Sequence, residues 1–273
     1  MEKIKNIIIE KLQQFFKDAG FSKAVLGMSG GIDSALVLAL AVEALGKDNV
    51  LPVLMPSKFS TDHSVNDALE MVKNVKTDHF IIPINDIYEV VNRSLEPVFQ
   101  GAPFDVTEEN IQARIRGVIL MAISNKQHRL LLNTSNKSEL CMGYGTLYGD
   151  LCGSISVIGD LYKTEVYQLS EWINRDGIRI PQNTIDKAPS AELRPGQKDS
   201  DSLPDYAVLD AILALYLDED LCEDEIVDEG YDRELVQRVL RGVARNEWKR
   251  LQFAPQLKVA PVSFGLDRRW PIS

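Results

Sequence analysis

The chain has 273 residues, of which 45% are hydrophobic and 26% are charged, an ordinary globular composition that can bury a large core. Its formal net charge of −10 argues against a nucleic-acid-binding surface, because such surfaces normally carry a basic stripe. No apolar run reaches the length of a membrane-spanning helix and no signal peptide begins the chain, so we expect a cytoplasmic protein without membrane or nucleic-acid partners.

Apolar periodicity predicts alternating helices and strands over the first half of the chain. An amphipathic pattern predicts a first helix over 3–18, ended by Gly20. Short apolar runs predict strands at 24–26, 50–55, 79–84 and 129–133. Longer patterns predict helices at 35–45, 61–75, 86–95 and 108–125. This alternation predicts an α/β fold, a three-layer α/β/α arrangement with a parallel, doubly wound sheet that binds its ligands at the carboxyl ends of the strands.

The second half of the chain is less regular. Proline and glycine predict a loop at 96–106, and a glycine-rich stretch at 143–160 predicts a long structured loop that forms a binding surface. Residues 187–202 are polar, as in a mobile lid, although a plain exposed linker is the alternative. Further helices are predicted at 163–175, 204–217 and 231–246. We expect a single domain over 1–273, with a sheet core at about 20–135, substrate-binding loops and helices at about 136–255 and an extended tail at 256–273.

A glycine-rich motif, Gly27-Met28-Ser29-Gly30-Gly31-Ile32-Asp33-Ser34, joins the first predicted strand to the next helix. Unpaired N–H groups and the positive end of the helix dipole favour a phosphate there, and glycine lets the backbone approach it closely. Ser29 and Ser34 can add hydroxyl donors. A carboxylate at Asp33 would repel bare phosphate, so its presence indicates a divalent cation between the two. An ordinary glycine-rich turn without a ligand is the alternative interpretation.

The pattern Ser-Gly-Gly-x-Asp-Ser at 29–34 resembles the pyrophosphate loop of the N-type ATP pyrophosphatases, which cleave ATP between the α and β phosphates and adenylate a substrate oxygen. It is unlike the Walker loop, since no Gly-Lys-Ser/Thr closes it. Five further blocks are similar to NAD synthetase and stand in that family's order: 109–116, 133–139, 143–150, 161–169 and 187–193. The likeness covers about residues 20–260 and implies an adenine nucleotide alpha hydrolase-like fold.

In detail the chain looks most like the synthetase domain of bacterial glutamine-dependent NAD synthetases, which carry an additional amidase domain. Only about 20 residues precede the first predicted strand, and Cys141, Cys152 and Cys222 form neither an amidase triad nor a C-x-x-C pair. The resemblance therefore implies an ammonia-dependent NAD synthetase, a carbon–nitrogen ligase that uses deamido-NAD, ATP, ammonia and Mg²⁺. A synthetase subunit fed by a separate glutaminase and another adenylating member of the superfamily stay open as alternatives.

The same resemblance implies roles for individual residues. It implies an ATP site made of Gly27, Met28, Ser29, Gly30, Gly31, Ile32, Asp33, Ser34, Thr134, Lys163 and Ser190. It implies deamido-NAD contacts at Arg114, Tyr148, Asp150, Lys187, Trp248 and Lys249. Asp33 and Glu139 would ligate magnesium, and Lys163 would stabilise the transferring phosphoryl group, which makes these three the catalytic residues. A capping aspartate, a surface glutamate and a solvated lysine are the plainer interpretations.

Two positions depart from the short ammonia-dependent members of the family. Leu147 stands where those proteins have a lysine, and Ser154 stands where they have an acid. The family resemblance also implies a homodimer with the dinucleotide site between subunits. The helices at 3–18 and 108–125, each apolar on one face, are the candidates for the interface.

Overall fold

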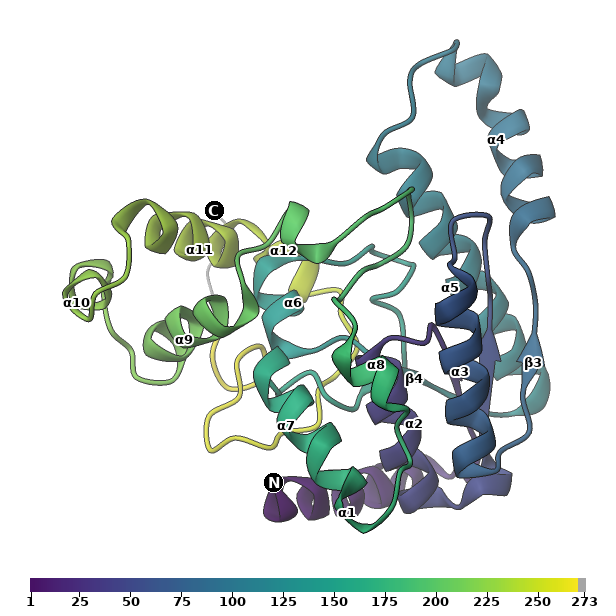
Figure 1. Ribbon diagram of the computed structural model, residues 1–273, viewed down its shortest axis with the longest axis horizontal. Coiled ribbons are helices and arrows are strands. Elements are labelled where there is room, and N and C mark those ends of the chain that lie inside the picture. The colour runs from purple at the N-terminus through teal and green to yellow at the C-terminus, as the bar shows by residue number, and fades with distance from the viewer. Residues whose placement is uncertain (270–273) are drawn as a thin grey trace.

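The computed structural model describes residues 1–269 and contains one parallel five-stranded sheet (Figure 1). The strands are β1 (Ala24–Gly27), β2 (Val50–Leu54), β3 (Phe80–Ile81), β4 (Leu130–Asn133) and β5 (Ile155–Ser156). They lie in the order β3-β2-β1-β4-β5, and every neighbouring pair is parallel. The chain therefore winds outward from β1 in one direction and then from β4 in the other, which confirms the predicted doubly wound sheet.

Twelve α-helices surround the sheet within the described residues. They are α1 (Glu2–Ala19), α2 (Ile32–Leu45), α3 (Asp62–Val75), α4 (Asn85–Phe99), α5 (Val106–Gln127), α6 (Lys137–Met142), α7 (Lys163–Ile173), α8 (Gln182–Asp186), α9 (Tyr206–Leu217), α10 (Glu223–Asp228), α11 (Arg233–Arg245) and α12 (Glu247–Arg250). The sequence did not predict α6, α8, α10 and α12, because four to six residues are too few to show a helical period.

Alternate strand residues face opposite layers, which gives the three-layer arrangement. Ala24 and Leu26 of β1 belong to a core with α1, α2, α3 and α7, whereas Val25 belongs to a second core with α4 and α5. On the apolar face of α1, Ile8, Leu12 and Phe16 are buried in this first core, whereas Ile4 and Phe15 are only partly buried. Of the two helices predicted as candidates for a dimer surface, only α5 has exposed large apolar side chains.

Three predicted boundaries are wrong. The strand at 79–84 shrinks to two exposed residues in β3, because this edge strand pairs only with β2. The loop at 96–106 is mostly helical at its start, since α4 continues through Pro97 to Phe99. Proline removes one helical hydrogen bond, but its fixed φ near −65° is close to the helical value, so the two residues that follow it can stay in the helix. The long loop at 143–160 contains β5, which is too short to show an alternating pattern.

The C-terminal half adds a helical lobe beside the sheet. Helices α9, α10 and α11 share a separate core, and they project at the left of Figure 1. The described part of the tail, 256–269, contains no helix and is tied down by Asp160, whose carboxylate accepts hydrogen bonds from the backbone of Val259 and the hydroxyl of Ser263. The predicted tail residues 270–273 lie outside the described residues. None of the helices within 1–269 combines the length and the apolarity needed to cross a membrane.

Candidate active site

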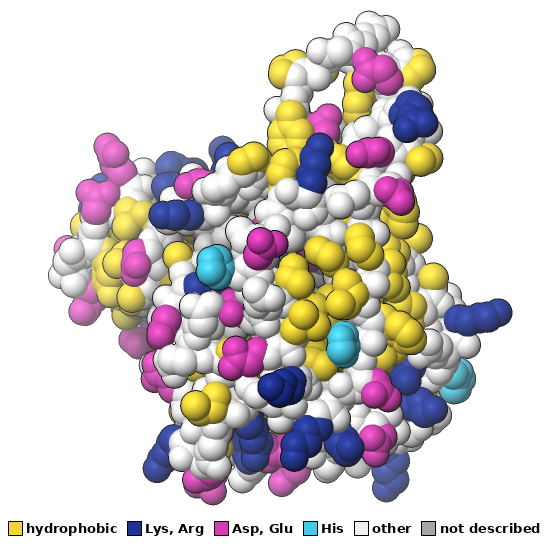
Figure 2. Space-filling model, turned by 45° about the vertical axis from the view of Figure 1, so that its right-hand side comes forward, with side chains coloured by type: hydrophobic (Ala, Val, Ile, Leu, Met, Phe, Trp, Pro, Cys, Tyr) yellow, Lys and Arg dark blue, Asp and Glu magenta, His cyan; other side chains and the backbone are white. Residues whose placement is uncertain are grey.

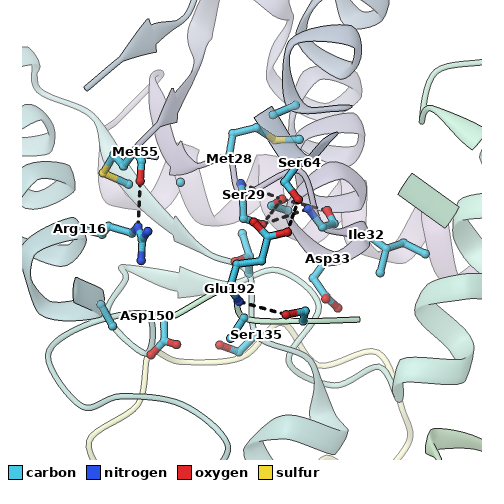
Figure 3. A pocket seen from close by; sticks show the side chains of 18 of the residues that line it. Met28, Ser29, Ile32, Asp33, Met55, Ser64, Arg116, Ser135, Asp150 and Glu192 are labelled. Atoms are coloured by element: carbon cyan, nitrogen blue, oxygen red, sulfur yellow. Dashed lines mark hydrogen bonds between the residues drawn. The ribbon is translucent and has the colours of Figure 1, made fainter. Parts of the chain in front are cut away.

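A cavity of about 280 Å³ opens where β1, β2 and β4 end (Figure 3). It lies beside the point where the winding of the sheet reverses, which is where doubly wound sheets bind their ligands. Its lining includes the predicted residues Gly27, Met28, Ser29, Gly31, Ile32, Asp33, Ser34, Thr134, Glu139, Asp150, Lys163, Lys187 and Ser190. Of the predicted ATP site, only Gly30 does not line this cavity.

The two serines of the glycine-rich motif shape the loop instead of offering free donors. The Ser34 hydroxyl donates to the carbonyl of Gly31 at 3.0 Å, so the 3.1 Å contact between the two serine hydroxyls uses the proton of Ser29. The amides of Ser29 and Gly31 in turn donate to the Ser34 and Ser29 oxygens. The hydroxyl donors expected from the sequence are thus used inside the loop, and the amides at the start of α2 are the donors left for an anion.

Gly30 fixes the loop against α3. Its φ of +82° lies in the left-handed region, and a Cβ built on it would lie 2.1 Å from the carbonyl oxygen of Ser64. No residue with a side chain fits there without moving the backbone of α3. This glycine therefore allows the glycine-rich loop 27–34 to pack on the first turn of α3.

Three predicted catalytic residues from separate segments meet at the cavity floor. Lys163 Nζ lies 2.5 Å from Asp33 Oδ2 and 3.3 Å from Glu139 Oε1, and the lysine side chain is only 2% exposed. The interpretation of Lys163 as a solvated surface lysine is therefore wrong. Burial raises the pKa of Glu139 to about 8, against the lowering effect of Lys163. Burial lowers the pKa of Lys163, but the two carboxylates outweigh it and the net direction is upward.

Hydrogen bonds hold these three side chains in place. Asn136, fully buried at the N-cap of α6, accepts from the amide of Glu139 at 3.0 Å and donates to Asp33 Oδ1 at 2.9 Å. The start of α7, where Lys163 lies, is held by Ser138, whose oxygen accepts from the Lys163 amide at 2.9 Å. Ser138 itself donates to the buried Asp210 of α9. The helical lobe thus helps to orient the lysine.

The donor set suits a magnesium ion completed by substrate. Mg²⁺ is usually held by one or two carboxylates together with phosphate oxygens and water. Asp33 and Glu139 offer two carboxylates beside the phosphate loop, and residues 1–269 contain no cluster of three or more acidic, histidine or cysteine ligands that would form a closed cage. The residues present therefore fit a magnesium ion that arrives with a polyphosphate.

The predicted deamido-NAD residues divide into two groups. Asp150 and Lys187 line the cavity, whereas Arg114, Tyr148, Trp248 and Lys249 do not. Those four lie close together outside it: Arg114 donates to the backbone of residue 147, and Tyr148 donates to Gln252, which in turn donates to the Trp248 carbonyl. Lys249 donates to the carbonyls of residues 143 and 145, so it closes the glycine-rich loop. Tyr148 remains 69% exposed.

Asp150 is less free than its position in the motif indicates. It accepts a hydrogen bond from the amide of Thr146 at 2.5 Å and so stabilises its own turn. Burial raises its pKa, and the nearby Arg116 opposes that shift. Its carboxylate is therefore a structural element of the cavity wall.

The cavity also contains a cation that was not predicted from the sequence. Arg116 lines it from α5, and its Nε donates to the carbonyl of Met55 at 3.0 Å (Figure 3). Burial lowers its pKa to about 10. Lys163 and Lys187 both have carboxylates within 4 Å, but no carboxylate of the described residues lies at ion-pair distance from Arg116. Its place at the end of the block 109–116, two residues after Arg114, was the signal in the sequence.

Asp199 was also missed. It lines the cavity and accepts from the hydroxyls of Tyr206 at 2.9 Å and Tyr144 at 3.2 Å. Burial raises the pKa of Asp199, and the nearby charge of Lys163 opposes that rise. It lies in the polar segment 187–202, which shows no hydrophobic pattern that would distinguish Asp199 from its neighbours.

A doubly wound sheet with a glycine-rich loop at its switch point, followed by the first turn of a helix, defines an α/β protein of the phosphate-binding class. Within that class the chain belongs to the NAD synthase family, whose pattern matches residues 4–253.

Individual relatives agree with this family. The chain is 49% identical over 272 residues to a glutamine-dependent NAD(+) synthetase of Synechocystis sp., with all of this chain and 49% of the relative covered. It spans about half the length of the curated relatives it matches. The glutamine-dependent NAD+ synthetase of Acinetobacter baumannii, solved in complex with ADP, is 41% identical with a TM-score of 0.67, covering 98% of this chain and 49% of that one. An NH3-dependent NAD synthetase of Campylobacter jejuni is 31% identical with a TM-score of 0.73, covering 91% and 95%.

Proposed function

We propose that this chain is a carbon–nitrogen ligase that joins ammonia to the nicotinate carboxylate of deamido-NAD with cleavage of ATP. One observation above all supports this: Asp33, Glu139 and Lys163 meet beside the phosphate loop in a cavity at the switch point of the sheet. Membership of the NAD synthase family agrees with it.

The chemistry requires activation of the carboxylate. An ionised carboxylate is a poor electrophile, so one of its oxygens first attacks the α-phosphorus of ATP and expels pyrophosphate. Ammonia then attacks the carbonyl carbon of the resulting acyl adenylate, AMP leaves, and the attacking nitrogen loses one proton. The products are NAD, AMP and pyrophosphate. Bringing two anionic substrates together makes positioning and charge neutralisation the main tasks of the protein.

The cavity residues suit these tasks. The amides at the start of α2 bind phosphate oxygens, and Lys163, held between two carboxylates, places its ammonium where charge develops on the transferring phosphoryl group. Asp33 and Glu139 would hold Mg²⁺, which neutralises phosphate charge when bound. Thr134 and Ser190 line the same cavity as ATP contacts, and Arg116, which has no carboxylate of residues 1–269 at ion-pair distance, supplies a further cation for an anionic substrate group.

The two groups of deamido-NAD residues suit a dinucleotide that spans two places. Asp150 and Lys187 border the cavity, where the nicotinate must meet ATP. The outer group, with Tyr148 and Trp248 exposed by 69% and 47%, offers aromatic surface and the cation of Arg114 to the remainder of the molecule.

The ammonia that reacts in this cavity can be free in solution or can be released from glutamine by a glutaminase. The Campylobacter jejuni relative, of which the chain covers 95%, is NH3-dependent, and this favours free ammonia. The glutamine-dependent relatives, of which it covers about half, favour delivery of ammonia by a glutaminase. We propose direct use of ammonia, with delivery by a partner or further domain as the alternative.

We also propose a homodimer that uses the outer face of α4 and α5. Figure 2 shows a yellow apolar patch on one face of the protein, and large apolar side chains of α4 and α5 are exposed by 39% to 74%. They include Ile87, Val90, Val98, Val118 and Met121. Such contiguous apolar surface is typical of a protein interface. Light scattering should give twice the chain mass, and Val118→Asp should give a monomer; a wild-type monomer would contradict this proposal.

A product assay tests the reaction. The protein is incubated with Mg-ATP and deamido-NAD in parallel with ammonium and with glutamine, and NAD, AMP and pyrophosphate are measured. NAD with one AMP from ammonium, and none from glutamine, supports direct use of ammonia. NAD from neither donor, with the protein folded and ATP bound, contradicts the proposal and favours another acceptor or a partner-fed subunit.

A further inference from the structure

The segment 187–202, predicted as a lid, forms one wall of the cavity. Its cavity-lining members are Lys187, Pro189, Ser190, Ala191, Glu192, Leu193 and Asp199. Side-chain bonds within the segment, such as Ser190 Oγ to the carbonyl of Gln197 at 2.5 Å, give it a compact shape. It is therefore neither a plain linker nor an open loop in this structure.

Glu192 attaches the segment to the first turn of α3. One carboxylate oxygen accepts from the Thr61 amide at 3.1 Å, and the other accepts from the hydroxyls of Thr61 at 3.0 Å and Ser64 at 2.5 Å. Figure 3 shows the side chain reaching across to Ser64. A carboxylate is well placed at the positive end of a helix, and hydrogen bonds to a charged acceptor are stronger than neutral ones.

The backbone at Glu192 indicates that this contact is not incidental. Its φ is +49°, in the left-handed region that residues with a Cβ rarely adopt and that costs free energy. The bonds to α3 oppose that cost. The fully buried Gln112 of α5 donates to the carbonyl of Leu193 at 2.8 Å, so adjacent residues of the segment are fastened to α3 and to α5.

The attachment point is shared with the phosphate loop. The carbonyl of Ser64 is the atom on which Gly30 packs, and the hydroxyl of the same residue donates to Glu192. Lys187 also donates to that hydroxyl at 2.8 Å. The closed segment and the phosphate loop therefore rest on one turn of α3.

We propose that Glu192 is a positioning residue that latches the 187–202 segment over the cavity and keeps water from the acyl adenylate. The second part rests on the proposed function. A closed wall matters there because water and ammonia compete for the same carbonyl carbon: attack by water would return the carboxylate and release AMP with no amide formed. Excluding bulk water is a general means by which closing segments protect reactive intermediates.

Limited trypsin digestion without substrate tests the latch. The segment offers cleavage after Lys187 and Lys198, while Arg194 precedes proline and resists. Glu192→Ala removes all three bonds to α3 and should be cut about tenfold faster than wild type. Ser64→Ala removes one of them and should be cut faster than wild type but slower than Glu192→Ala, and the double variant should be cut no faster than Glu192→Ala. Asp201→Asn is the matched control, since this carboxylate bonds only within the segment, to Arg194 and Lys198. Cleavage of both single variants within about twofold of wild type overturns the latch.

The ratio of AMP to NAD formed, at limiting ammonium, tests the protection of the adenylate. It should be close to one in wild type and in Asp201→Asn, and should rise about threefold or more in Glu192→Ala, with Glu192→Gln between them. A ratio that stays at one while the segment is cut faster overturns the water-exclusion role. If wild type makes no NAD, the proposed function fails, and the digestion result still decides the latch.

Discussion

Replacing Lys163 by methionine would remove the buried ammonium group while keeping an unbranched side chain of similar length. In the wild-type protein this group lies 2.5 Å from Asp33 and 3.3 Å from Glu139. The exposed fractions of the three side chains are 2%, 19% and 16%, so solvent compensates little for the missing charge. The variant therefore leaves two carboxylates close together without a cation between them.

The distances give the expected magnitude. At an effective dielectric constant of about 20, unit charges 3.3 Å apart attract one another by about 5 kcal/mol. The cost of burying the ammonium offsets part of this, and removing one partner of a buried pair typically costs about 3 to 5 kcal/mol. We expect Lys163→Met to lower the free energy of unfolding by about 3 kcal/mol at about pH 8.5.

The loss should be smaller at about pH 6. Burial raises the pKa of Glu139 from 4.5 to about 8 in the folded protein. The protonated Glu139 carboxyl stabilises the folded protein fully below pH 4.5, and this contribution is lost as the pH rises through the folded-state pKa of about 8. At about pH 6 Glu139 is therefore neutral, and removal of the Lys163 ammonium costs less.

Urea unfolding at both pH values measures the effect. Glu139→Gln in the Lys163→Met background should recover about 1 to 2 kcal/mol at the higher pH, because it removes a buried carboxyl group that must either take up a proton or stay charged without its cation. Lys47→Met is the control: Lys47 is 54% exposed and 3.6 Å from Asp48, so a change under about 0.5 kcal/mol is expected. A loss below about 1 kcal/mol, or an equal loss at both pH values, would refute the electrostatic account.

Three further predictions concern the phosphate loop and the metal. Asp33→Asn should abolish pyrophosphate release while circular dichroism shows an intact fold; turnover like that of wild type would sink the magnesium assignment. The apparent Mg²⁺ affinity, measured from activity, should rise as the pH goes from about 6.5 to about 8.5, because a proton competes with the metal at Glu139, whose pKa is raised to about 8; a flat profile would contradict this. Gly30→Ala should cost about 3 kcal/mol in urea unfolding, since its Cβ would lie 2.1 Å from the carbonyl of Ser64 and its φ is +82°; a loss below about 0.5 kcal/mol would show that α3 can move aside.

Most of the fold could be predicted because the hydrophobic patterns of its longer elements extend over many residues. The alternation of apolar strands and periodic helices predicted a parallel, doubly wound sheet, and the strand order in the structure agrees with it. The errors fall in elements that are too short to show a periodic pattern, such as the two-residue strands β3 and β5. Pro97 misled the interpretation in the other direction, because a helix-breaking residue is tolerated near the end of α4.

The candidate site could be predicted in part. Asp33, Glu139 and Lys163 stand at element ends within ordered motif blocks, and the structure brings them together. Arg116 and Glu192 lie within the blocks 109–116 and 187–193 but received no role, because an arginine on a helix and an acid in a polar segment are ordinary in sequence. Only their burial and their partners, the carbonyl of Met55 for the arginine and the turn of α3 for the acid, distinguish them.

By itself, the sequence determined what depends on neighbours along the chain: the strand–loop–helix unit with its phosphate-binding backbone, the alternation of elements, and the presence of charged residues at their ends. The tertiary structure alone decided what depends on residues far apart in sequence. It buried one apolar face on each of α1 and α5, and only on α5 did it leave further large apolar side chains, Val118 and Met121, exposed. It also turned the hydroxyls of Ser29 and Ser34 inward and fastened the 187–202 segment to α3 through Glu192. The physical reason is that periodicity reports which side chains share a face, whereas the partner that covers a face or accepts a proton is set by the packing of the whole chain.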